Sequence, residues 1–367
     1  MTDVFPHLHI ILLCEEQGAR LWPIANDNAP SCLAPEEPGS QTSLLAATIR
    51  RVAPFTDNPL HVVTAQQFAA TLEDELLACP ELAHHDVDML VSPLARGNAF
   101  AVALAAARIR SQDPSAVIAV FPTNQKVEMD DRWQHTMYRA YLAALQDKVV
   151  VLGSQQERKC ADCTYIHKAG AFEDMEDTYT VRSFVANAPV LVARRARREG
   201  ALWYTGIIFA RAAVLMGEMA RAAELGKTDA TRSSNRLVET ANFFAALGVR
   251  DLLKKEAREI IATIPELTLD KALLETCDNM VVLSTSISFS TVTGLLDLEQ
   301  NIEPDSQQNR TRGNGTVLNS RNTTVYAQED GRKVVALGMR DCIIVDTGDT
   351  VLVAHKDHLD RLDTADI

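Results

Sequence analysis

The stretch LLCEEQGARLWP, residues 12–23, predicts the end of a buried strand, a tight loop and the start of a helix. Loops in this place bind phosphate when glycines let backbone N–H groups approach the anion closely. Here Glu15 and Glu16 occupy the loop instead, and their carboxylates would repel a phosphate. Gly18 and Arg20 could still hold one, although a plain turn with an exposed arginine is the favoured interpretation of these two residues taken alone.

Short apolar runs alternate with helical patterns from this stretch to about residue 210. Five runs predict strands: HIILLC (9–14), LHVVTA (60–65), VDMLVS (87–92), AVIAVFP (116–122) and VVVLGS (149–154). This alternation indicates a Rossmann-like α/β fold, with a mostly parallel sheet covered on both faces. Ligands bind beyond the carboxyl ends of such strands, so residues 14–20, 92–98 and 122–125 should face one crevice.

The pattern loosens after about residue 155. The segment TYTVRSFVANAPV predicts an edge strand and then a helix. YTGIIFA (204–210) predicts a strand, and AAVLMGEMARAAEL predicts a helix. LDKALLETCDNMVVL (269–283) predicts a helix that leads into a strand. The polar segment EPDSQQNRTRGN, residues 302–313, predicts a boundary. Short strand patterns follow it: GTVLN, TTVYAQ, KVVALGM, DCIIVDT and DTVLVAH. We therefore predict an α/β domain over residues 1–300 and a small β domain, β-helix-like, over residues 301–367.

The composition excludes several classes of function. The chain has 367 residues and a formal net charge of -13, which predicts no binding to nucleic acid or to an anionic membrane. No apolar run is long enough to span a bilayer, and the N-terminal segment lacks the basic start of a signal peptide. Seven dispersed cysteines indicate reduced thiols and a cytoplasmic protein.

Four further motifs have both a structural and a functional interpretation. Residues 92–98 (SPLARGN) could bind an anion at a helix N-terminus, or Asn98 could simply cap that helix. Residues 122–125 (PTNQ) are best read as a polar turn, because Mg²⁺ prefers carboxylates. Cys160 and Cys163, with His167, resemble half of a zinc site, but no second pair exists. The arginines of residues 194–198 predict a solvated helix face or a contact with an acidic partner.

Taken together, these pieces resemble the mannose-1-phosphate guanylyltransferases, within the sugar-phosphate nucleotidylyltransferases. The resemblance extends in order over nearly the whole chain. It implies a nucleotidyltransferase fold, a C-terminal β domain that helps to build dimers, and a reaction of GTP with mannose 1-phosphate that gives GDP-mannose and pyrophosphate with Mg²⁺.

The positions that the resemblance assigns to chemistry are largely changed. The family's A-G-G-x-G-T-R-L-W-P becomes CEEQGARLWP, and its following lysine becomes Ser31. The aspartate of its P-A-D-H, a metal ligand, becomes Asn124, and the second metal aspartate, in W-S-D-V-G, becomes Thr291. The resemblance implies substrate-binding roles at seven positions: Gly18, Arg20, Arg96, Asn98, Tyr165, Gly206 and Asp270. It leaves no confident catalytic residue and no metal ligand.

These losses predict a catalytically silent or strongly impaired member, acting as a structural or regulatory partner in a homo- or hetero-oligomer. An active guanylyltransferase is a candidate partner. We expect no cofactor, and Mg²⁺ only if activity remains. Two alternatives stay open. The chain could sense a sugar nucleotide such as GDP-mannose without turnover. It could also be an active nucleotidyltransferase whose rebuilt site uses Arg20, Arg96 and Asp270, with Glu15, Glu16 or Asp162 in new roles.

Overall fold

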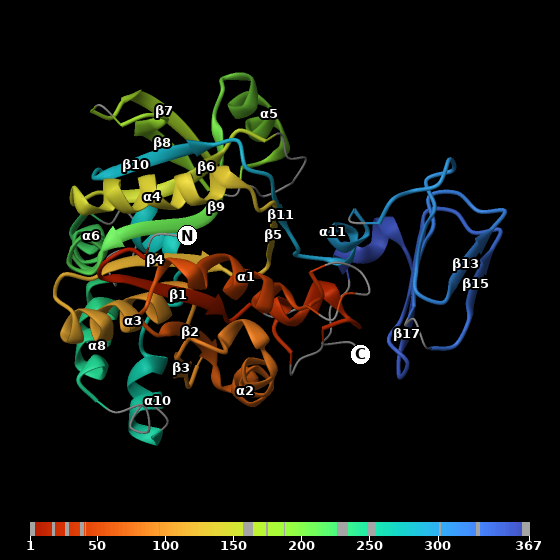
Figure 1. Cartoon of the computed structure of the whole chain (residues 1–367), viewed down its shortest axis with the longest axis horizontal. Coiled ribbons are helices and arrows are strands. Elements are labelled where there is room, and N and C mark those ends of the chain that lie inside the picture. The colour runs from red at the N-terminus through yellow and green to blue at the C-terminus, as the bar shows by residue number, and fades with distance from the viewer. Residues whose placement is uncertain are drawn as a thin grey trace.

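A nine-stranded sheet, ordered β3-β2-β1-β4-β9-β6-β10-β8-β7, forms the centre of the α/β part (Figure 1). The computed structural model describes all residues except 1–3, 17–18, 26–28, 37–39, 41, 95, 157–163, 174, 187, 226–233, 248–253, 301, 328–330 and 362–367. The strands are β1 Leu8–Cys14, β2 Leu60–Ala65, β3 Val87–Ser92, β4 Val117–Pro122, β6 Val149–Ser154, β7 Tyr165–Ala171, β8 Thr178–Val185, β9 Leu202–Arg211 and β10 Met280–Thr285.

Most strands of this sheet share one direction. β9 runs antiparallel to β4 and β6, and β8 runs antiparallel to β10 and β7, while the remaining strands point the same way. The predicted mostly parallel α/β fold is therefore confirmed, and the five apolar runs correspond to β1, β2, β3, β4 and β6.

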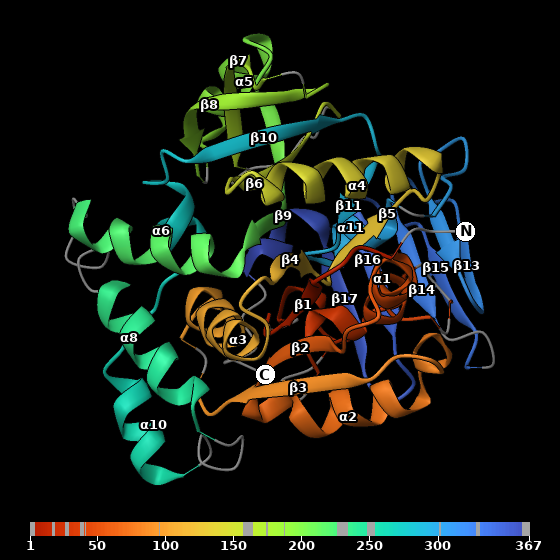
Figure 2. The same ribbon diagram turned by 60° about the vertical axis from the view of Figure 1, so that its left-hand side comes forward.

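Helices cover both faces of the sheet. Side chains alternate between the two faces along each buried strand, so both faces are apolar and each needs a covering layer. In β1, Leu8, Ile10 and Leu12 pack in one hydrophobic core, and Ile11 packs in the other. The helices are α1 Leu44–Val52, α2 Ala69–Ala78, α3 Asn98–Gln112, α4 Asp131–Leu145, α5 Val190–Arg198, α6 Ala212–Leu225, α8 Ser234–Ala245, α10 Lys255–Ala262 and α11 Leu295–Glu299. Figure 2 shows α3, α6 and α8 grouped beside one another. Among the helices of the described residues, none combines the length and apolar character that crossing a bilayer requires.

Two predictions for the middle of the chain need correction. The predicted edge strand, β8, lies between β10 and β7, and β7 also pairs with β9. Residues 178–185 have the sequence pattern of an edge strand because exposed side chains recur along β8. The backbone of β8 is nevertheless paired on both sides. The helix predicted within residues 269–283 is only the short π-helix Asp270–Leu274.

The C-terminal strands alternate between two small sheets. They are β12 Arg310–Arg312, β13 Gly315–Leu318, β14 Thr324–Ala327, β15 Val334–Leu337, β16 Cys342–Asp346 and β17 Val351–His355. β12, β14 and β16 pair in parallel, as do β13 and β15, and β17 closes the first sheet antiparallel to β16. Parallel pairing of every second strand is the pattern of a β-helix. The last five strands match the five predicted patterns, whereas β12 lies inside the segment predicted as a boundary.

The C-terminal strands also pack against the α/β part. Ile343 and Val345 of β16 share a core with Leu295 and Leu298 of α11. Glu299, at the end of α11, accepts a hydrogen bond from the Thr324 hydroxyl at 2.7 Å. The division of the chain at residue 300 stays a prediction.

Candidate active site

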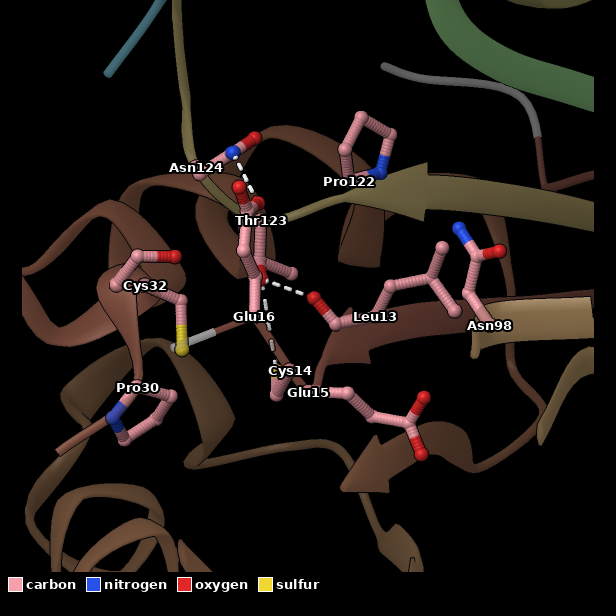
Figure 3. Close-up of a pocket in the computed structure, with 11 residues that line it drawn as sticks. Leu13, Cys14, Glu15, Glu16, Pro30, Cys32, Asn98, Pro122, Thr123 and Asn124 are labelled. Atoms are coloured by element: carbon pink, nitrogen blue, oxygen red, sulfur yellow. Dashed lines mark hydrogen bonds between the residues drawn. The ribbon is translucent and has the colours of Figure 1, made fainter. Parts of the chain in front are cut away.

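A small cavity of about 110 Å³ lies beyond the carboxyl ends of β1 and β4 (Figure 3). Its lining comes from four places in the sequence: residues 13–16 at the end of β1, residues 30–32, Asn98 at the start of α3, and residues 122–124 at the end of β4. The sequence predicted that the loops after β1, β3 and β4 would share one crevice, and the cavity brings parts of all three together. Pockets that bind small-molecule ligands usually measure about 300–1,000 Å³, so this cavity is small.

Glu16 and Asn124 close the cavity on one side. The Asn124 side-chain amide donates a hydrogen bond to Glu16 Oε2 at 2.6 Å, as Figure 3 shows. Asn124 is only 6% exposed, so this bond satisfies a buried donor that would otherwise cost free energy. The backbone N–H of Val292 donates to the Asn124 carbonyl oxygen at 2.8 Å. The loop after β1 is therefore attached to the loop after β4.

The second changed metal position lies close to the first. Thr291 ends the short strand β11 Phe289–Thr291, which pairs with β5 Gln125–Val127 so that Thr291 faces Gln125. The structure thus brings together Asn124 and Thr291, where the family resemblance implies two aspartates. Both side chains are neutral, and among the described residues the carboxylates that line the cavity are those of Glu15 and Glu16.

The protein environment opposes ionisation of both glutamates. Burial raises the pKa of Glu15 to about 7. Burial also raises the pKa of Glu16, and the nearby Arg20 guanidinium partly offsets that rise. Glu16 as a residue is exposed to solvent, and the hydrogen bond from Asn124 fixes its carboxylate at the cavity. A phosphate approaching this cavity would meet carboxylates rather than N–H donors.

We expect the variant Glu15→Gln to be more stable than the parent protein at high pH. The folded-state pKa of Glu15 lies above the unfolded value, so its contribution to stability is fully present below pH about 4.5 and is lost as the pH rises through about 7. At pH 8 the glutamine should raise the free energy of unfolding by up to about 3 kcal/mol. Urea titrations at pH 5 and pH 8 measure the difference, and an equal effect at both would contradict it.

The rest of the described lining carries no positive charge. Ser31 is buried where the family has a lysine, and its backbone N–H donates to the Glu16 carbonyl oxygen at 2.9 Å. Cys14 Sγ lies 3.6 Å from Thr123 Oγ1. Burial and the neighbouring Cys14 thiol raise the pKa of Cys32, so this thiol stays neutral. None of these described residues neutralises a polyphosphate.

The loop before α3 is oriented by the backbone around Leu267. Gly97, not Asn98, is the N-cap of α3 and has a φ of 74°. The Asn98 side-chain oxygen accepts the Leu269 N–H at 2.7 Å, so the capping interpretation of Asn98 is wrong. The Arg96 guanidinium donates to the carbonyl oxygen of Ala262, at the end of α10, and Arg96 does not line the cavity.

The other predicted substrate-binding residues lie outside the cavity lining. Arg20 is exposed in the short helix Ala19–Leu21. Tyr165 is buried in β7, and its hydroxyl has no hydrogen-bond partner in the described structure. Gly206 has a φ of 86°, and a Cβ there would lie 3.0 Å from the Pro122 ring. Asp270 begins the π-helix, where burial raises its pKa to about 6.

Several predictions lie outside the described residues, namely those at Gly18, Asp162, Cys160 and Cys163. Of the residues to which the sequence assigned substrate binding, Asn98 is the one that reaches the cavity in the described part of the chain. The structure therefore supports the predicted location of the site more than the predicted list of residues.

The donor set around the cavity does not fit Mg²⁺. Within the described ranges, no group of three or more histidine, cysteine and acidic residues is arranged to hold a metal ion. Mg²⁺ needs several oxygen ligands in near-octahedral geometry, whereas Asn124 donates its N–H group to Glu16 and offers one neutral oxygen, its buried and unpartnered Oδ1 in the described structure. We therefore assign no chemical step to a metal ion at this cavity.

The Glu16–Asn124 hydrogen bond is the feature that sequence reasoning missed. The sequence did hold a signal for it. At position 16 a glycine became a carboxylate, and at position 124 a carboxylate became an amide, relative to the family pattern. An aspartate at position 124 would repel Glu16, whereas asparagine donates to it. The two changes are physically complementary, so they can be explained as one rearrangement.

The fold and the position of the cavity define an α/β protein of the nucleotidyltransferase class with β-helix-like C-terminal strands. Residues 313–361 match the family described as MannoseP isomerase/GMP-like beta-helix domain. The chain is 25% identical over 363 residues to the xanthan biosynthesis protein XanB of Xanthomonas campestris, covering 99% of this chain and 72% of that protein. It is 24% identical to the mannose-1-phosphate guanylyltransferase of Salmonella muenchen, covering 93% of this chain and 68% of that protein.

A solved structure agrees with this fold. The crystal structure of a protein from Thermus thermophilus, named mannose-1-phosphate geranyltransferase, matches with a TM-score of 0.80 and 21% identity over 97% of each chain. The chain therefore has the fold of the sugar-phosphate nucleotidyltransferases and resembles curated mannose-1-phosphate guanylyltransferases over most of its length.

Proposed function

We propose that this chain is a catalytically silent or strongly impaired relative of the mannose-1-phosphate guanylyltransferases, and that it acts as a structural or regulatory partner in an oligomer. An active guanylyltransferase is the candidate partner. The observation that supports this most directly is the hydrogen bond of 2.6 Å between Glu16 and Asn124 in the cavity. In this bond Glu16, from the loop that corresponds to the family's phosphate-binding loop, accepts from Asn124, at the position that corresponds to the family's metal-binding aspartate.

The charge balance of the cavity supports the same proposal. Nucleotidyl transfer depends on positioning the phosphates and neutralising the charge that develops on them. In the described lining the charged side chains are acidic, and Ser31 replaces the family's lysine. The Arg96 guanidinium is engaged with the Ala262 carbonyl oxygen instead. Each of these features opposes the binding of GTP with Mg²⁺.

Two other functions have specific observations in their favour. An exposed Arg20 close to Glu16 could contact a sugar nucleotide such as GDP-mannose, so a sensor without turnover is the second candidate. A rebuilt active site could use the buried carboxyl group of Asp270, whose pKa is about 6. Mg²⁺ would matter only in this last case. The free thiols of the described cysteines fit a reducing compartment, and we propose a cytoplasmic location.

We expect no pyrophosphate release above background when the purified protein is mixed with GTP, mannose 1-phosphate and excess Mg²⁺. The physical reason is the missing positive charge and the missing metal ligands at the described cavity. A coupled pyrophosphate assay measures this, with circular dichroism showing that the sample is folded. Turnover that disappears in the variant Arg20→Ala would contradict the proposal and establish the rebuilt active site.

The same preparation separates the partner from the sensor. Saturable thermal stabilisation by GDP-mannose, without turnover, would identify a sensor. Co-purification of a discrete guanylyltransferase, without any effect of the nucleotide on stability, would identify a partner.

A further inference from the structure

Helix α5 presents an exposed basic stripe on the surface of an acidic protein. Leu191, Arg194, Arg195 and Arg198 are spaced i, i+3, i+4 and i+7, so they share one face of the helix. We call these four residues the α5 stripe. Its opposite face is buried through Ala193 and Ala196, which pack in the core. All four stripe residues are exposed, and Leu191 is 77% exposed.

The charges around the α5 stripe are mostly unsatisfied. Arg195 pairs with Glu199 at 2.8 Å, whereas no ion pair in the described structure engages Arg194 or Arg198. Glu199 also lies 3.8 Å from His167 of β7, so it is shared between α5 and the neighbouring strand. Exposed arginines beside an exposed leucine favour a contact with an acidic surface that has apolar pockets.

A groove with matching properties lies beside α2. It has a volume of about 450 Å³ and is lined by the apolar side chains of Leu76, Leu82, Val87 and Met89. Glu73 and Asp86 lie on its rim, both exposed and without an ion pair in the described structure. We call these six residues the α2 groove. His85 and Leu77 also line it, and Leu77 is 81% exposed.

The α5 stripe and the α2 groove cannot meet within one molecule. α5 lies beside β7 at the top of the molecule, and α2 lies under β3 at the bottom, in both views of the structure (Figures 1 and 2). β3 is one edge of the nine-stranded sheet, and β7 is the last strand at the other end of the strand order, where it also pairs with β9. A contact between these surfaces therefore requires two molecules.

We propose that the α5 stripe of one copy of this chain docks in the α2 groove of a second copy. Leu191 enters the apolar part of the groove, while Arg194 and Arg198 face Glu73 and Asp86 on its rim. The two surfaces are different, so the contact is heterologous and joins copies head to tail, as a ring or an open array. A helix of nine residues buries a small area, so the association is weak and concentration-dependent. It depends on exposed charges, so salt weakens it.

The test is a pair of charge-reversed variants studied by sedimentation velocity at increasing concentration. Variant one carries Arg194→Glu and Arg198→Glu, and variant two carries Glu73→Lys and Asp86→Lys. We expect each variant alone to associate at least about tenfold more weakly than the parent protein. An equimolar mixture should associate again, because each variant then meets an opposite charge on the other.

The mixture distinguishes this interface from misfolding and from other interfaces. A parent protein that stays monomeric at every concentration would overturn the proposal, and so would association that neither variant weakens. The control variant Leu318→Ser with Leu337→Ser changes exposed apolar residues of β13 and β15, and it should associate like the parent. The proposal would also be overturned if this control lost association while both charge-reversed variants kept it. The result is independent of the pyrophosphate assay, so this inference and the proposed function can fail separately.

Discussion

Replacing Glu15 and Glu16 by glycine is expected to tighten GTP binding by on the order of 100-fold. A carboxylate about 5 Å from a phosphate, at an effective dielectric constant of about 20, costs roughly 3 kcal/mol. Burial raises the pKa of both glutamates, to about 7 for Glu15, so this figure applies to a fully ionised carboxylate. Glycine also frees the cavity that the Glu16 side chain occupies. Isothermal titration calorimetry with GTP measures the change.

Two matched variants separate charge from bulk. Glu15→Gln with Glu16→Gln removes the charges and keeps the side-chain volume, so it should recover part of the gain. Glu256→Gln with Glu259→Gln removes two charges from the exposed face of α10, and it should change GTP binding little. If the glycine variant bound GTP no better than the parent protein, the barrier would lie elsewhere, and the engagement of Arg96 with Ala262 would be the next candidate.

Replacing Gly97 by alanine is expected to lower the free energy of unfolding by about 3 kcal/mol or more. Gly97 has a φ of 74°, and a Cβ there would lie 2.2 Å from the Leu267 carbonyl oxygen and 2.7 Å from its carbon. Backbone atoms cannot rotate away as a flexible side chain can, so the loop before α3 must shift. That shift would also weaken the hydrogen bond from Leu269 to Asn98 at the cavity. Urea denaturation followed by circular dichroism measures the loss.

Gly217→Ala is the matched control for this prediction. Gly217 lies within α6, is exposed, and has no atom within 4 Å of the position a Cβ would take. Alanine there should stabilise the protein by about 0.5–1 kcal/mol, because glycine loses more backbone freedom in a helix. Equal effects of the two substitutions would show that the contact with Leu267 does not control the stability of this loop.

The changes in the sequence fall on the cavity rather than on the core. The buried strands and the helix α3 keep the apolar residues that the fold requires. The loops after β1 and β4 have changed together, through Glu16 and Asn124. Under the proposed function the core and the surfaces remain available to a partner, which is why the oligomeric state matters as much as the assay of turnover.

The sequence determined most of the strands, their order along the chain and the place of the cavity. Five apolar runs correspond to β1, β2, β3, β4 and β6, because a strand covered on both faces must be apolar along its length. The short C-terminal strands were equally clear, because Asn, Asp and Gly separate them. The place of the crevice followed from a general rule, that ligands bind beyond the carboxyl ends of parallel strands.

Only the tertiary structure decided where the functional side chains point. The order of strands in the sheet, with β9 inserted between β4 and β6, depends on contacts distant in the sequence. Arg96 matches the family motif, yet its guanidinium reaches Ala262, which is 166 residues further along the chain. The bond between Glu16 and Asn124 joins residues 108 positions apart. Local patterns report propensity and burial, whereas the partner of a polar side chain depends on which loops the packed core brings together.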